Sequence, residues 1–89
     1  MKLNGKTLDS YVGAYQMQPD VVMTVSRRGD RLFGQRGSQD KVELFAETET
    51  EFFVKVTNAQ VTFVKDSAGR VTQVVIHQGG LDERGPKIK

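Results

Sequence analysis

The 89-residue sequence has no cysteine and only one histidine. Without cysteine the fold has neither a disulfide framework nor a thiolate metal site. Its stability must come from apolar packing and from a closed ladder of hydrogen bonds. A single imidazole cannot form a metal site without help from carboxylates or thiolates. We therefore interpret His77 as a structural or surface residue, and we expect no metal and no cofactor.

The chain also has no large excess of positive or negative charge. Thirteen basic residues stand against eleven acidic ones, which leaves a net charge of +2. The basic residues are scattered, and the nearest approach to a cluster is Arg27, Arg28 and Arg31, which flank a turn. We interpret this group as a solvated hairpin end rather than a phosphate-binding site. The sequence therefore predicts no nucleic-acid partner.

Long apolar runs are missing as well. No stretch approaches the roughly 18 apolar residues that a membrane-spanning helix needs, so no membrane partner is expected. Residues 1–9 are polar, and we expect no signal peptide at the start of the chain. These features leave the cellular compartment open.

What the sequence does contain is a series of short strand signals at even intervals. Runs rich in β-branched residues alternate with turn signals such as Gly29-Asp30 and Gly79-Gly80. The expected strands cover residues 13–18, 21–28, 31–35, 41–47, 51–56, 59–65, 71–78 and the tail 81–89. Pro86 restricts the tail to an edge or closing strand. Residues 7–11 are predicted to form one helical turn with Thr7 as its N-cap.

These short connections predict the fold class. Eighty-nine residues make one domain and leave no room for two, so we predict a single domain over residues 1–89. Parallel strands would need long crossover connections, which are absent. An antiparallel meander hides its edges most easily by closing on itself. We therefore predict an all-β fold, a small antiparallel up-and-down barrel of about eight strands with a short N-terminal helical turn.

The two faces of these strands differ in polarity. The expected inward set is Val42, Leu44, Ala46, Phe52, Val54, Val56, Val61 and Phe63. Phe45, Phe53 and Val75 fall at outward positions, where the other residues are mostly polar. Either an N-terminal segment covers them, or they form an apolar patch meant for another domain. A third possibility is an interior cavity for a small apolar ligand, since eight strands enclose about enough room for one.

Catalytic motifs are weak. Ser38 and Lys41 match the S-x-x-K pattern of serine β-lactamases and penicillin-binding proteins. That pattern needs the serine at the start of a buried helix, whereas Ser38 is expected in a polar loop. Glu47, Glu49 and Glu51 alternate through a predicted turn, where solvent reaches them. We therefore predict no catalytic residue and no enzymatic activity for this chain alone.

Three longer segments of the sequence nevertheless resemble those of a known family. They are LDSYVGAY at residues 8–15, ELFAETETEFF at residues 43–53 and VTFVKD at residues 61–66. From about residue 8 to residue 88 the chain resembles the lipocalin-like domain of unknown function found at the C-terminus of many serine β-lactamase-related hydrolases, the penicillin-binding-protein superfamily. The resemblance implies a small barrel that packs on or near a catalytic domain, in proteins that are often periplasmic or secreted. No catalytic position carries over to this chain.

Because the hydrolase domain is absent from this sequence, the chain is either a fragment or a barrel that exists alone. The first hypothesis is a non-catalytic accessory or interaction domain whose partner is a catalytic hydrolase domain, in cis or in trans. Its candidate docking residues are Phe45, Phe53 and Val75.

The alternative hypothesis is a free-standing binder of a small apolar ligand in the barrel interior. It predicts a pocket lined by Tyr15, Phe52 and Phe63. The competing interpretation of these three aromatic residues is plain core packing, because small barrels usually fill their interior with side chains.

Overall fold

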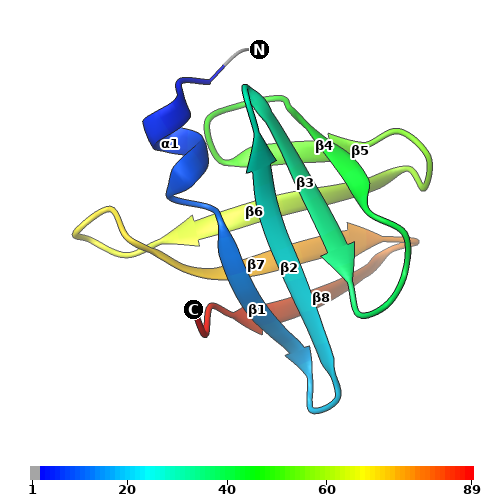
Figure 1. The fold of residues 1–89 in the computed structure, drawn as a ribbon. Coiled ribbons are helices and arrows are strands. Elements are labelled where there is room, and N and C mark those ends of the chain that lie inside the picture. Colours follow the sequence, from blue (N-terminus) through cyan, green and yellow to red (C-terminus); the bar gives the residue numbers. More distant parts are fainter. Residues whose placement is uncertain (1–2) are drawn as a thin grey trace.

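The computed structural model describes residues 3–89 as one short helix followed by eight β-strands (Figure 1). In chain order the elements are α1 (Gly5–Asp9), β1 (Gly13–Gln18), β2 (Val21–Arg28), β3 (Arg31–Arg36), β4 (Val42–Ala46), β5 (Glu51–Val54), β6 (Ala59–Lys65), β7 (Val71–Gln78) and β8 (Leu81–Pro86). Each strand pairs antiparallel with its neighbours in sequence. The predicted all-β meander is therefore confirmed.

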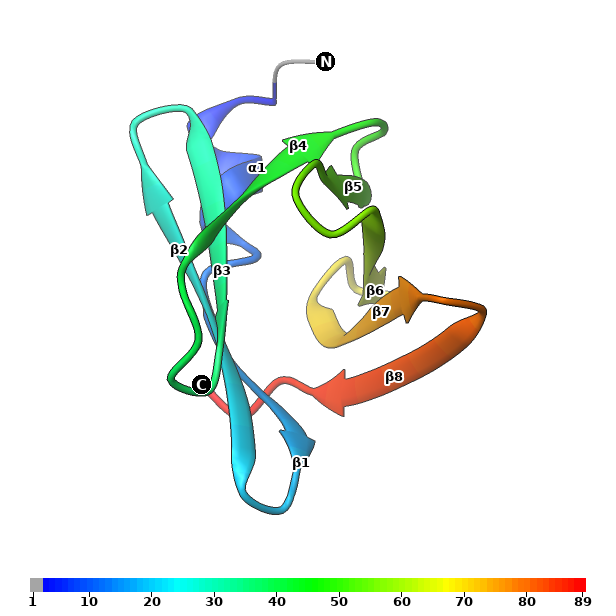
Figure 2. The same cartoon turned by 90° about the vertical axis from the view of Figure 1, so that its right-hand side faces the viewer.

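The meander closes into a nearly complete barrel where the end of the chain returns to β1 (Figures 1 and 2). Tyr15 and Lys87 form a β-bridge, and the amide of Ile88 donates a hydrogen bond to the carbonyl of Ala14 at 2.8 Å. Pro86 is the last residue of the closing strand β8, and the amide of the following Lys87 donates to the Thr72 carbonyl of β7 at 2.8 Å.

Glycine allows this close approach. A Cβ atom on Gly85 of β8 would overlap the Met17 sulfur of β1 and would lie 3.0 Å from the carbonyl oxygen of Gln16. A larger residue at this position would push β8 away from β1. The absence of a side chain at Gly85 therefore favours barrel closure.

Two local predictions were wrong. The N-cap of α1 is Asn4, whose side-chain oxygen accepts a hydrogen bond from the Thr7 amide at 2.8 Å, so the helix begins earlier than expected. Asparagine caps helices as well as threonine does, and Asn4 lies one turn earlier. Val56 was assigned to the inward set, but it lies in the turn at residues 55–58 and is 78% exposed. Asn58, with φ of 53°, adopts the left-handed conformation that completes this turn.

Four aromatic rings form the centre of the core. Tyr11, Tyr15, Phe52 and Phe63 are each at most 2% exposed. The rings of Tyr11 and Phe63 stack at 4.3 Å, and Phe52 meets each of them edge-on. Both tyrosine hydroxyls donate to backbone carbonyls, Tyr11 to Glu49 and Tyr15 to Tyr11. Burial raises the pKa of both hydroxyls, which therefore stay neutral donors.

Candidate functional site

The outer face of β4 and β5 carries a pair of phenylalanines. Phe45 and Phe53 are cross-strand partners, and their rings stack with centroids 5.5 Å apart. Both side chains are half-buried. The ammonium group of Lys55 lies 4.2 Å from the centre of the Phe45 ring, within the range of a cation–π interaction. These two predicted docking residues thus form one aromatic patch, which we call the Phe45–Phe53 pair.

Val75, the third predicted docking residue, differs from this pair. It lies on β7, where its cross-strand neighbours are Thr62 of β6 and Arg84 of β8. Only 4% of its surface is exposed. A partner would find almost no surface at Val75 to contact, so this residue has no place in a docking patch.

The three residues predicted to bind a ligand lie in the packed core. Tyr15 and Phe63 have ring centroids 5.9 Å apart, and Phe63 and Phe52 have centroids 5.5 Å apart. The rings fill this part of the interior with one another. Ligand binding by Tyr15, Phe52 and Phe63 stays a prediction.

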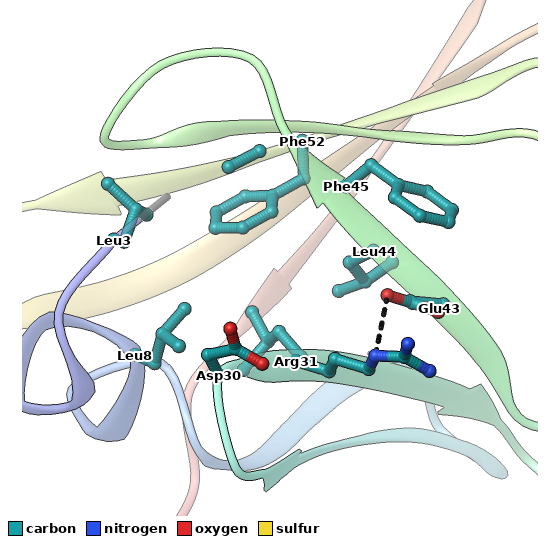
Figure 3. Close-up of a pocket in the computed structure, with 10 residues that line it drawn as sticks. Leu3, Leu8, Asp30, Arg31, Glu43, Leu44, Phe45 and Phe52 are labelled. Atoms are coloured by element: carbon teal, nitrogen blue, oxygen red, sulfur yellow. Dashed lines mark ion pairs between the residues drawn. The ribbon is translucent and has the colours of Figure 1, made fainter. Parts of the chain in front are cut away.

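One pocket, of about 290 Å³, lies at the end of the barrel where α1 packs (Figure 3). Its apolar wall is made by Leu3, Leu8, Leu32, Leu44, Phe45, Ala46 and Phe52. The polar side consists of Asp30, Arg31 and Glu43, and Arg31 Nε lies 3.9 Å from a carboxylate oxygen of Glu43. Figure 3 shows Leu3 and Leu8 on one side of the space and Phe52 on the other.

A second, smaller pocket of about 120 Å³ lies inside the barrel near the turns that follow β3, β5 and β7. Its walls are mainly apolar and its rim is polar. The lining residues are Met23, Gly34, Arg36, Gln39, Asp40, Val42, Leu44, Val54, Thr57, Ala59, Val61, Ile76 and Gln78. We call this space the Gly34 pocket.

An ion pair joins separate strands beside the Gly34 pocket. The guanidinium of Arg36 on β3 contacts both carboxylate oxygens of Glu83 on β8, at 3.1 and 2.6 Å. The side-chain amide of Gln18 on β1 donates to the same carboxylate at 2.8 Å. The hydrogen bond from Arg36 is the main cause that lowers the pKa of Glu83, and Gln18 adds to it. Arg36 and Glu83 lie 47 residues apart, so no local sequence signal predicted this pair.

His77 lies between two polar side chains on the outer face of the sheet. Its Nδ1 lies 2.6 Å from a carboxylate oxygen of Asp82, and its Nε2 lies 3.4 Å from the hydroxyl oxygen of Thr62. The order hydroxyl, imidazole, carboxylate matches that of a catalytic triad. However, the hydroxyl is at the limit of hydrogen-bond distance, and the His77 and Asp82 side chains are 39% and 54% exposed. This geometry is poorly suited to activating a nucleophile.

The sequence alone predicts one of the two contacts of His77. A two-residue turn at Gly79-Gly80 places His77 opposite Asp82 in the hairpin, as the observed register does. The contact with Thr62 depends instead on the register between β6 and β7.

The remaining sequence candidates do not assemble into a site. Ser38 lies in the loop between β3 and β4 rather than at a helix start, so the S-x-x-K match lacks its structural context. Within residues 3–89 no group of three or more His, Cys, Asp or Glu side chains is arranged to hold a metal ion. Nor does this part of the chain contain a helix with the length and hydropathy for crossing a membrane.

Comparisons with known proteins agree with the family resemblance noted in the sequence. The family described as "Domain of unknown function (DUF3471)" matches residues 2–85. Penicillin-binding protein 4* of Bacillus subtilis (strain 168) is 28% identical over 81 residues, which cover 89% of this chain and 17% of that protein. The chain therefore spans less than a fifth of the length of this relative. The predicted relation to penicillin-binding-protein-like proteins is confirmed.

Proposed function

The chain belongs to the DUF3471 family of domains of unknown function, and on that basis we propose that it is a non-catalytic domain that packs against a serine β-lactamase-like hydrolase domain. The relative matches over only 17% of its own length, as expected for a domain appended to a larger protein. The exposed, loosely arranged Thr62–His77–Asp82 row supports a role other than catalysis.

The observation that carries this proposal is the Phe45–Phe53 pair. Two stacked rings that stay half-exposed on a sheet face are unusual, because polar residues occupy most of the other outward positions. Aromatic side chains are enriched at protein–protein interfaces, where they give large contact area at small entropic cost. We infer that the exposed parts of the Phe45 and Phe53 side chains become buried against the hydrolase domain.

The partner lies in cis or in trans, and the physical requirements of the two arrangements differ. Through a short flexible linker, the effective concentration of an attached domain reaches about the millimolar range. Under that condition a contact surface smaller than that of a free complex holds the two domains together. A partner in trans would need a larger contact surface, because association then costs translational and rotational freedom.

Amide hydrogen exchange tests the docking surface. The segment of penicillin-binding protein 4* that matches is replaced by this chain, and exchange is compared with that of the isolated chain. We expect slower exchange over residues 42–54 in the chimera, because the partner excludes water from β4 and β5. Phe53→Ser should remove this difference. Phe33→Ser is the matched control, because Phe33 is half-buried on the outer face of β3 and lies outside the patch.

Equal exchange over residues 42–54 in the chimera and in the isolated chain would contradict the proposal. So would a loss of protection caused equally by Phe33→Ser and Phe53→Ser, because protection would then reflect general stability rather than a local contact.

A further inference from the structure

We propose that the Gly34 pocket is a binding site for a small, neutral, apolar molecule about the size of one aromatic ring. The site lies inside the barrel, whereas the Phe45–Phe53 pair lies on the outer face of the same strands. The inference is therefore independent of the proposed docking function.

The walls of the pocket come from inward-facing residues of successive strands. Gly34 of β3 is paired with Val42 of β4, and Val61 of β6 is paired with Ile76 of β7. Val54 of β5 completes this apolar surface. A guest in this space would bury apolar surface against these walls, and removal of that surface from water is the main source of affinity for apolar ligands.

The pocket exists because position 34 has no side chain. The inward positions of β3 alternate Leu32, Gly34 and Arg36, so a glycine stands where a core residue is expected. Glycine weakens a strand interior and often marks a place that another group approaches closely. At Gly85 that group is Met17 of the chain itself.

No such group lies beside Gly34. A Cβ atom built there would have its nearest neighbours at 3.6 Å, the two methyl carbons of Leu44, which is ordinary van der Waals contact. The chain's own packing therefore does not require glycine at position 34. What the glycine provides is open space beside Leu44, and we assign that space to a guest.

The size of the pocket sets the size of the guest. Its volume of about 120 Å³ is somewhat less than that of an engineered apolar cavity of about 150 Å³ that stays dry and binds benzene. The guest is therefore a single ring or a short branched alkyl group. Longer chains exceed the space.

The rim explains why the guest is neutral and small. The guanidinium of Arg36 is already bound to Glu83 through two hydrogen bonds, so it is not available to an anionic ligand. Gln39, Asp40, Thr57 and Gln78 form the remaining polar rim. An apolar protein surface over this rim would remove water from these groups without replacing their hydrogen bonds. A small molecule leaves them hydrated.

Titration of the ¹⁵N-labelled chain with benzene, followed by NMR, tests the site. We expect shifts of the amides of Gly34, Val61 and Ile76 that saturate with benzene concentration. Gly34→Val fills the space and should abolish these shifts. Thr24→Val is the matched control, because Thr24 is exposed on the neighbouring strand β2, and it should leave binding unchanged.

Gly34→Ala keeps the experiment decisive if the valine variant does not fold. Its Cβ fits beside Leu44 but removes part of the volume, and we expect the dissociation constant for benzene to rise by about tenfold. The inference is overturned if benzene at saturation in water moves none of the three amides. It is also overturned if Gly34→Ala and folded Gly34→Val bind benzene as wild type does, or if the shifts centre on Phe45 and Phe53. A third outcome would also refute the inference. If benzene does not bind and the pocket rim becomes buried only in the hydrolase chimera, the space belongs to a side chain of the partner.

Discussion

Replacing Phe63 by leucine should lower the free energy of unfolding by about 2 kcal/mol. Leucine keeps most of the apolar burial, and near volume-conserving core changes alone cost less than about 1.5 kcal/mol. The ring, however, contacts Tyr11, Tyr15 and Phe52 at centroid distances of 4.3, 5.9 and 5.5 Å. Each such aromatic pair contributes about 0.5–1.5 kcal/mol beyond area burial, and the hydrophobic contacts of leucine offset part of that loss.

Thermal unfolding followed by circular dichroism measures the effect. For a domain of this size, 1 kcal/mol corresponds to a change in Tm of about 4–8 °C, so a decrease of about 8–16 °C is expected. Phe33→Leu is the control, because Phe33 is half-buried on the outer face and lies outside the aromatic cluster. If Phe63→Leu and Phe33→Leu lower Tm equally, the argument that mutual ring contacts stabilise the core is refuted.

Three further predictions concern closure, pH and catalysis. Gly85→Ala should destabilise the fold by about 1–3 kcal/mol in urea denaturation, because the added methyl overlaps Met17, and an unchanged midpoint would contradict the role assigned to this glycine. The pKa of Glu83 is lowered in the folded state, so its ionised form stabilises the fold above the ordinary glutamate pKa, and this contribution is lost as pH falls through the lowered value. Glu83→Gln should therefore lose less stability than wild type between neutral and acidic pH, and parallel pH profiles would argue against the ion pair with Arg36. Finally, neither the chain nor its His77→Ala variant should hydrolyse nitrocefin or p-nitrophenyl acetate, and turnover that depends on His77 would show that the row on the outer face is catalytic.

The strands themselves were largely predictable from the sequence. The bounds of residues 13–18, 21–28, 59–65 and 71–78 agree with the structure, because clear turn residues follow these runs, three of which are rich in β-branched residues. The error at Val56 arose because alternation alone continues a strand until something stops it. Here the stop was the left-handed conformation of Asn58, which the apolar pattern does not reveal.

The candidate sites were harder to predict, for a physical reason. The pairing of Phe45 with Phe53 depends only on neighbouring strands, and their outward positions followed from alternation. The Gly34 pocket and the Arg36–Glu83 ion pair depend on how the whole sheet curves back on itself. A glycine in a strand can serve close approach or leave open space, and only the positions of Met17 and Leu44 distinguish Gly85 from Gly34.

The seam between β1 and the end of the chain is also the place where we expect the barrel to open locally. Every other pair of neighbouring strands is joined by a short connection, whereas the seam joins the two ends of the meander and has one β-bridge at Tyr15 and Lys87 and a hydrogen bond from Ile88 to Ala14. Separation of the seam leaves all the hairpins paired, so it is the opening that costs least. Opening of this seam would admit solvent to the barrel interior while every hairpin stays paired.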